Sequence, residues 1–171
     1  LNMEKLKIIG GNKLSGSISC SGAKNAALPM LAATILSDEP ITFKNLPYLQ
    51  DITTMFEILG SMGADITLNE SMDFIISTSK LHDFEARYEL VKTMRASILV
   101  LGSLVARYGF ARIALPGGCA IGTRPVDFHL DALEKLGAKI ELKNGYIEAT
   151  SKKLVGCEIN FPGVSVTGTE N

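Results

Sequence analysis

Residues 26–36 read AALPMLAATIL, and apart from Thr34 every one of them is apolar. A helix at the surface of a globular protein keeps one polar face, and this stretch has none. It therefore predicts a helix that is buried on all sides, with Pro29 in its first turn or at a kink. Residues 91–109, VKTMRASILVLGSLVARYG, predict a second helix of the same nearly all-apolar kind.

Each apolar helix is followed by the same series of elements. Alternating and helical spacings of apolar residues predict a strand, an amphipathic helix and two strands, first at 41–45, 51–63, 65–68 and 74–77, and again at 110–115, 128–136, 139–142 and 146–149. In the first amphipathic helix Asp51 is the expected N-cap and Gly63 the expected C-cap. Asn144-Gly145 is the expected hairpin turn. Two more short strands are predicted at 4–9 and 15–20, around a turn at 10–12.

Sequence landmarks indicate that these two series are a repeat. Leu-Pro at 115–116 matches Leu-Pro at 46–47 with an offset of 69, and Leu-Gly-Ala at 136–138 matches Met-Gly-Ala at 62–64 with an offset of 74. The second unit therefore carries five extra residues between these landmarks. Residues 167–171 echo residues 21–25 at an offset of 146 and predict the start of a third unit. Repeated units bury their faces against one another, so we expect an α/β fold that needs further units, and a chain that is part of a longer protein.

The five-residue insertion falls in residues 116–129, PGGCAIGTRPVDFH, which predict a glycine-rich loop. Cys119 stands between glycines and close to Arg124, which favours a reactive thiol at a loop tip. A small buried apolar residue is the alternative for a free cysteine. Asp127 has two interpretations, a site residue or the N-cap of the helix that follows, and His129 is equally consistent with a helix surface.

Three cations suggest an anion-binding site. Lys24 and Arg95 are predicted in the first turn of the two apolar helices, where the helix dipole disfavours a cation unless an anion joins it. Free N–H groups at a helix N-terminus bind anions, and Arg124 lies on the glycine-rich loop. We interpret the three as one anion pocket. The alternative is solvated charges just outside the core.

The composition excludes several other classes. The 171 residues are 46% hydrophobic and 20% charged, with a formal net charge of −1, so no basic surface for nucleic acid is expected. No apolar run is long enough to span a bilayer and no signal peptide is recognised, which makes the cytoplasm the expected location. Cysteines at 20, 119 and 157 have no CxxC spacing, and predict neither a disulfide framework nor a zinc site.

Three motifs carry a resemblance to a known family. SGAKNAALP at 21–29, LVKTMRAS at 90–97 and PGGCAIGTRPVD at 116–127 closely resemble the UDP-N-acetylglucosamine 1-carboxyvinyltransferases. The resemblance covers essentially the whole chain, and implies an inside-out α/β barrel of repeated βαβαββ units. It implies that residues 1–20 form strands that pack on a second domain, which this chain lacks. Residues 21–171 would be an incomplete first domain, with units at about 21–89 and 90–160 and a third beginning near 161.

The resemblance also implies a reaction and its residues. Members of the family are cytoplasmic enzymes that open bacterial peptidoglycan synthesis, and thus serve cell-wall biogenesis, cell shape and division. They join the enolpyruvyl group of phosphoenolpyruvate to the 3-hydroxyl of UDP-N-acetylglucosamine by addition and elimination, without a metal or redox cofactor. The antibiotic fosfomycin alkylates their loop cysteine. The residues implied as catalytic are Cys119, Lys24 and Arg124. Those implied as phosphoenolpyruvate ligands are Lys24, Asn25 and Arg124. Those implied at the UDP-sugar are Arg95, Arg124, Pro125, Val126, Asp127, Phe128, Gly163, Val164, Ser165 and Val166.

Other functions are weighed against this one. The related 5-enolpyruvylshikimate-3-phosphate synthase shares the fold and the donor, but lacks the Gly-Gly-Cys loop. An inactive UDP-sugar-binding module is the alternative from another class, and Cys119, Lys24 and Arg124 argue against it. A purely structural repeat protein leaves the loop unexplained. Because the family places its aspartate base and two further arginines in the second half, we expect little activity from these 171 residues alone, and the missing C-terminal half as their partner.

Overall fold

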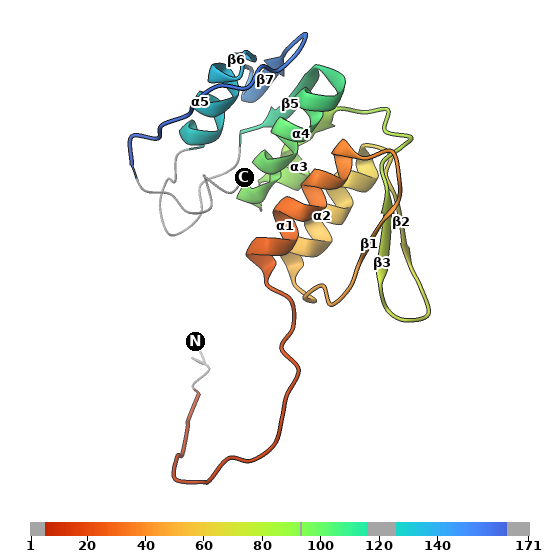
Figure 1. Cartoon of the computed structure of the whole chain (residues 1–171), viewed down its shortest axis with the longest axis vertical. Helices are drawn as coiled ribbons and strands as arrows, with labels where there is room; N and C mark the ends of the chain where they lie inside the picture. Colours follow the sequence, from red (N-terminus) through yellow and green to blue (C-terminus); the bar gives the residue numbers. More distant parts are fainter. Residues whose placement is uncertain (1–5, 93, 116–125, 164–171) are drawn as a thin grey trace.

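The structure, a computed structural model, describes residues 6–92, 94–115 and 126–163. Its first half contains helix α1 (Lys24–Ala33), a 3₁₀ turn (Thr34–Leu36), strand β1 (Ile41–Phe43), helix α2 (Gln50–Ser61) and strands β2 (Asp65–Leu68) and β3 (Phe74–Ser77). The three strands form an antiparallel sheet in the order β1-β3-β2. The predicted succession of helix, strand, helix, strand and strand is confirmed in this half (Figure 1).

The second half repeats that succession after a short lead-in. It contains strand β4 (Glu85–Ala86), helix α3 (Tyr88–Val91), a 3₁₀ turn (Arg95–Ile98), helix α4 (Leu99–Tyr108), strand β5 (Phe110–Ala114), helix α5 (Asp127–Lys135) and strands β6 (Lys139–Lys143) and β7 (Tyr146–Thr150). The sheet order is β4-β5-β7-β6, with β4 parallel to β5 and the other pairs antiparallel. Strands β5-β7-β6 thus follow the same order as β1-β3-β2.

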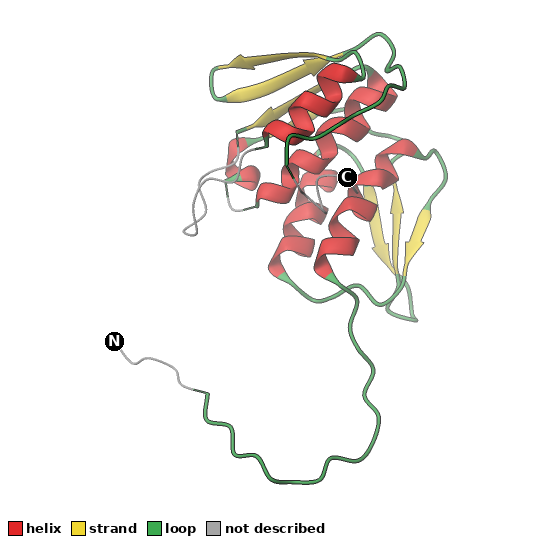
Figure 2. Ribbon diagram, turned by 60° about the vertical axis from the view of Figure 1, so that its left-hand side comes forward, coloured by secondary structure: helices red, strands yellow, loops and turns green. Residues whose placement is uncertain are grey.

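The two sheets lie at different sides of a central group of helices (Figure 2). Helix α1 packs against α2 and α4, and α4 also packs on the 3₁₀ turn that extends α1. Leu31 of α1 and Leu101 and Leu104 of α4 are fully buried there. Burying a leucine side chain contributes about 1.5–3 kcal/mol, so this contact between the two apolar helices is a main source of stability.

Helix α1 is not buried on all sides, and that prediction is wrong. Ala26, Met30 and Ala33 lie on one face at helical spacing, and Met30 is 50% exposed. Helices α2 and α4 cover the other faces, where Leu28 and Leu31 are buried. A helix that is apolar on all faces buries only those faces that neighbouring elements cover.

The second apolar stretch is also not a single helix. Helix α3 ends at Val91, Met94 has an extended backbone with φ −138° and ψ 112°, and α4 starts only at Leu99. The Ser97 hydroxyl donates to Met94 O at 2.8 Å, which satisfies a carbonyl at the break. Because Val91 and Met94 are both buried, the chain keeps its apolar side chains in the core while the backbone bends.

Residues 6–20 form no strand, so the strands predicted at 4–9 and 15–20 are wrong over the described part of that range. The segment extends away from the body (Figures 1 and 2), and Leu6, Ile8, Leu14 and Ile18 are each at least 82% exposed. A strand exists through the backbone hydrogen bonds of a partner strand, and none lies beside this segment within the described residues.

The predicted hairpin turn at 144–145 is confirmed, whereas residues 10–12 form no turn, so the turn predicted there is wrong. Asn144 and Gly145 both have positive φ, 52° and 80°, as a two-residue hairpin turn requires. The C-cap of α2 is Met62, so the predicted C-cap Gly63 lies one residue beyond it. Gly63 has φ 106°, and Ala64 N–H donates to Leu59 O, a common helix termination. None of the helices in the described ranges is long and apolar enough to cross a membrane.

Candidate functional site

Lys24 is the first residue of α1 and lies beside the start of α2. Its Nζ is 2.6 Å from Oδ2 of Asp51, the second residue of α2. Asp51 is therefore not the N-cap that the sequence predicts, because Leu49 takes that position and makes no side-chain cap. A carboxylate in the first turn is favourable to the dipole of its own helix, and here it also neutralises the cation of the neighbouring helix. The anion expected near Lys24 is thus supplied, in this structure, by the chain itself.

The segment before α1 is tied to the loop before α2. Gly22 N–H donates to Asn45 O at 3.1 Å, and Asn45 Nδ2 donates to Cys20 O at 3.2 Å. These bonds fix the backbone entering α1, so the positions of Lys24 and of its exposed neighbour Asn25 are set by tertiary contacts.

The backbone of Arg95 opens the 3₁₀ turn that leads into α4, one element earlier than the predicted first turn of an α-helix. Its side chain lies outside what the structure describes. Six other predicted site residues lie entirely outside the described residues: Cys119, Arg124, Pro125, Val164, Ser165 and Val166. Both ends of the loop are described: Leu115 N–H donates to Gly145 O at 2.9 Å, and Val126 precedes α5.

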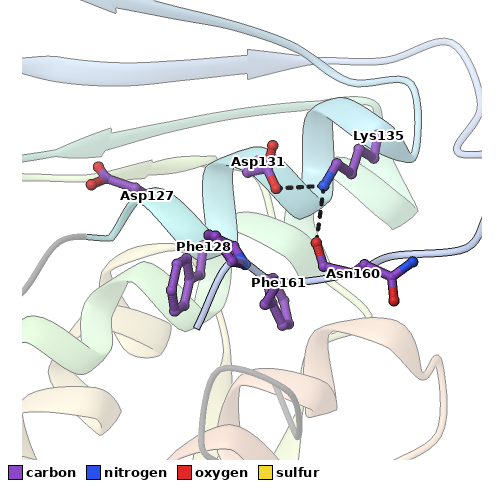
Figure 3. Close-up of a pocket in the computed structure, with 7 residues that line it drawn as sticks. Asp127, Phe128, Asp131, Lys135, Asn160 and Phe161 are labelled. Atoms are coloured by element: carbon purple, nitrogen blue, oxygen red, sulfur yellow. Dashed lines mark hydrogen bonds and ion pairs between the residues drawn. The ribbon is translucent and has the colours of Figure 1, made fainter. Parts of the chain in front are cut away.

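An open pocket of about 690 Å³ lies along α5 (Figure 3). Phe128 of α5 stacks on Phe161, with ring centroids 5.1 Å apart and planes at 26°. Lys135 Nζ is 2.8 Å from Asp131 Oδ2 and 3.4 Å from Asn160 O. The lining residues are Asp127, Phe128, Asp131, Lys135, Asn160, Phe161 and Pro162.

Three of the residues predicted at the UDP-sugar lie in or beside this pocket. Asp127 and Phe128 line it, and a Cβ placed on Gly163 would lie 3.8 Å from the Phe128 ring. Asp127 is the first residue of α5 and its N-cap is Val126, with no side-chain cap, so the N-cap interpretation of Asp127 is wrong. Its carboxylate is left available to the pocket rather than to the helix backbone.

Sequence reasoning missed the other lining residues. Asp127, Asp131 and Lys135 recur every four residues and so share one face of α5, a signal that was present in the sequence. Phe161 had no such signal, because its stacking on Phe128 joins residues more than thirty positions apart. His129, one residue further along α5, is half-buried, and burial lowers the pKa of its imidazole. Neutral imidazole is therefore favoured, and His129 does not add a cation to the pocket at neutral pH.

The side chains that line the pocket suit a polar ligand with an aromatic part. It combines an aromatic pair, a lysine and carboxylates with an open mouth. Cys20 and Cys157 are free and exposed. Among residues 6–92, 94–115 and 126–163, no three His, Cys, Asp or Glu side chains are grouped as a metal site would require.

Comparison with solved structures defines the class of the fold. The enolpyruvyl transferase NikO from Streptomyces tendae matches with a TM-score of 0.71 at 27% identity, over 88% of this chain and 33% of that one. EPSP synthase from Acinetobacter baumannii matches with a TM-score of 0.68 at 17% identity, over 90% of this chain and 36% of that one. The mixed α/β fold is that of the enolpyruvyl transferases.

Sequence comparison then gives the family. The model of the EPSP synthase family (3-phosphoshikimate 1-carboxyvinyltransferase) matches residues 8–171, and the chain belongs to this family. UDP-N-acetylglucosamine 1-carboxyvinyltransferase from Halorhodospira halophila is 56% identical over 169 residues, 99% of this chain and 40% of the relative. The enzyme of that name from Coxiella burnetii is 57% identical over 170 residues, 99% of this chain and 39% of the relative. The chain thus spans about 40% of the length of these curated relatives.

Proposed function

We propose that this chain is part of a UDP-N-acetylglucosamine 1-carboxyvinyltransferase. The observation that carries the proposal is the identity of 56–57%, over 99% of the chain, to relatives of that name. In the proposed reaction the 3-hydroxyl of UDP-N-acetylglucosamine gives its proton to a base and its oxygen bonds to C2 of phosphoenolpyruvate, while an acid protonates the C3 methylene. Loss of a C3 proton and of phosphate then restores the double bond.

Phosphoenolpyruvate needs a cluster of cations because it carries a phosphate and a carboxylate. Lys24 is the described cation that suits this role best, since it is the first residue of α1, where the helix dipole favours an anion, and its side chain is 41% exposed. Asn25 follows it at the same helix end. Arg124 completes the proposed set, and electrostatic stabilisation of the charged tetrahedral intermediate would be its main effect.

The proposed acid is Cys119. A thiol can protonate the methylene carbon only if it is held protonated or regenerated in place, and a cationic pocket that favours thiolate also explains a covalent adduct. Alkylation by fosfomycin belongs to the same proposal.

The proposed UDP-sugar site includes the pocket along α5. The half-buried aromatic pair offers a surface on which a base could stack, and Asp127 offers hydrogen-bond acceptors. Arg95, the 124–128 run and residues 163–166 are assigned to the same ligand.

The name of the matching family model favours a second candidate, synthesis of 5-enolpyruvylshikimate 3-phosphate. The 17% identity to an EPSP synthase of known structure supports the shared fold alone. The Gly-Gly-Cys loop and the closer relatives weigh for the nucleotide sugar.

The proposal extends to the setting of the whole protein. We place it in the cytoplasm and in peptidoglycan synthesis, with a barrel of repeated βαβαββ units whose second and third units begin near residues 90 and 161. We propose that residues 1–20, which form no strand over their described part in this chain, pair as strands only on a second domain. Turnover by residues 1–171 alone should be very low.

The test is a full-length chimaera in which residues 1–171 replace the matching part of the Coxiella burnetii relative, hereafter the chimaera. We expect it to release phosphate from phosphoenolpyruvate with UDP-N-acetylglucosamine and not with shikimate 3-phosphate. The unaltered relative is the control for folding and assay. A chimaera that turns over shikimate 3-phosphate, or is inactive although folded, would contradict the proposal.

A further inference from the structure

The ion pair between Lys24 and Asp51 joins the starts of two packed helices. The 2.6 Å contact runs from the first residue of α1 to the second residue of α2, and both helices begin at the same end of the helical group (Figure 1). The side chains are 41% and 33% exposed. The cation is therefore held in place without being buried.

The backbones of both partners are held by neighbouring contacts. The Gly22–Asn45 and Asn45–Cys20 hydrogen bonds fix the chain that enters α1. Buried Leu28 and Ile52, four residues after Lys24 and one residue after Asp51, anchor the beginnings of the two helices in the core. With the backbones fixed, the Asp51 carboxylate determines where the Lys24 ammonium lies.

Stability alone gives a poor reason for this arrangement. A partly exposed ion pair contributes little to folding, and Lys24 occupies a position where the helix dipole disfavours a cation. A carboxylate also repels a phosphate or carboxylate ligand, so Asp51 is no direct ligand for an anion. Its effect on an anionic substrate has to pass through Lys24.

We propose that Asp51 is a positioning residue that orients the Lys24 ammonium for phosphoenolpyruvate. This inference rests on the proposed function, which makes Lys24 a ligand of that substrate. In the substrate-bound state, Asp51 accepts one N–H of the ammonium, and the remaining N–H groups are directed at the anion. Loss of the Asp51 carboxylate removes one repulsive charge near the substrate, but it also allows the long Lys24 side chain to adopt several rotamers.

The test compares three variants of the chimaera: Asp51→Asn, Asp51→Glu and, as a matched control, Asp38→Asn. Asp38 pairs with Arg107 in another part of the molecule, and Arg107 keeps its bonds to two backbone carbonyls when that carboxylate is lost. Kinetics with both substrates give kcat and the KM for phosphoenolpyruvate. NMR of selectively labelled lysine reports the ordering of the Lys24 ammonium, with the signal assigned through Lys24→Arg.

We expect Asp51→Asn to lower kcat about 10- to 100-fold while the KM for phosphoenolpyruvate changes by less than about 3-fold, because misplacement affects the transition state more than binding. Asp51→Glu should recover most of kcat, and Asp38→Asn should resemble the parent. Among the three variants, only Asp51→Asn should show increased mobility of the Lys24 ammonium by NMR.

Two results would overturn the inference: an unchanged kcat in Asp51→Asn, or a Lys24 signal that does not depend on Asp51. The NMR readout needs no turnover, so it decides the positioning role even if the parent chimaera is inactive. Inactivity of the parent chimaera would count against the proposed function and not against this inference.

Discussion

At Gly22 the segment before α1 lies directly against the loop before α2. The Gly22 N–H donates to Asn45 O, and a Cβ at this position would lie 2.2 Å from the same oxygen. We expect Gly22→Ala to lower the free energy of unfolding by about 1–3 kcal/mol, because the contact is with backbone and cannot relax by rotating a side chain. Urea denaturation of the 171-residue chain, followed by circular dichroism, measures the change.

The matched control is Gly60→Ala in α2, where nothing lies within 4 Å of the added Cβ. That change should stabilise the protein by about 0.5–1 kcal/mol, since alanine favours a helix interior over glycine. Equal effects of the two substitutions would show that the close approach at Gly22 has no energetic weight.

For single residues, the position of a side chain in its helix could be predicted from the sequence better than its interaction partner. The helical position of Lys24 and its need for an anion could be predicted, because the dipole argument depends on local position only. The partner could not, because Asp51 comes from another helix. For the same reason both N-cap predictions failed: a carboxylate near a helix start can cap the backbone or serve a distant group, and local sequence does not distinguish the two.

Among the elements, one arginine adds hydrogen bonds to the apolar contact between α4 and the end of α1. Arg107 Nη1 donates to Ile35 O at 2.6 Å and to Ser37 O at 2.8 Å, and Nη2 pairs with Asp38. We expect Arg107→Met to lower the free energy of unfolding by about 2–4 kcal/mol, because two carbonyls lose a charged donor. Thermal and urea unfolding of the 171-residue chain provide the measurement.

Arg87→Met is the control, since the Arg87 side chain is 68% exposed and, within the described residues, forms an ion pair only with Asp83, four residues before it. Its loss should cost about 0–1 kcal/mol. If Arg107→Met were as mild as this control, the two helices would be joined by apolar packing alone.

Elements with strong local signals were predicted well. The two hairpins and α2 follow from alternation, helical spacing and turn residues within a few positions. The break between α3, which ends at Val91, and the 3₁₀ turn that starts at Arg95 could not be predicted, since no Gly or Pro marks it and the bend depends on which neighbours the core offers.

For the whole molecule, the repeat in the sequence and the strand orders β1-β3-β2 and β5-β7-β6 agree. The predicted strands before residue 20 failed because a strand is made by its partner, whereas a helix makes its own hydrogen bonds. In the candidate site, Asp127 and Phe128 line one pocket and Gly163 lies beside the Phe128 ring, while their role at the UDP-sugar stays a prediction from the resemblance. Phe161 was found only through the fold.

The most direct test of the proposed enzyme is reaction of the chimaera with fosfomycin, with and without UDP-N-acetylglucosamine, followed by peptide mapping of the mass gain. Within residues 1–171 we predict labelling at Cys119 alone, promoted by the nucleotide sugar, because only this thiol belongs to the proposed cationic pocket. Cys20 and Cys157 are exposed and serve as internal controls. Equal labelling of the three cysteines, or none at Cys119 in the presence of the nucleotide sugar, would contradict the account.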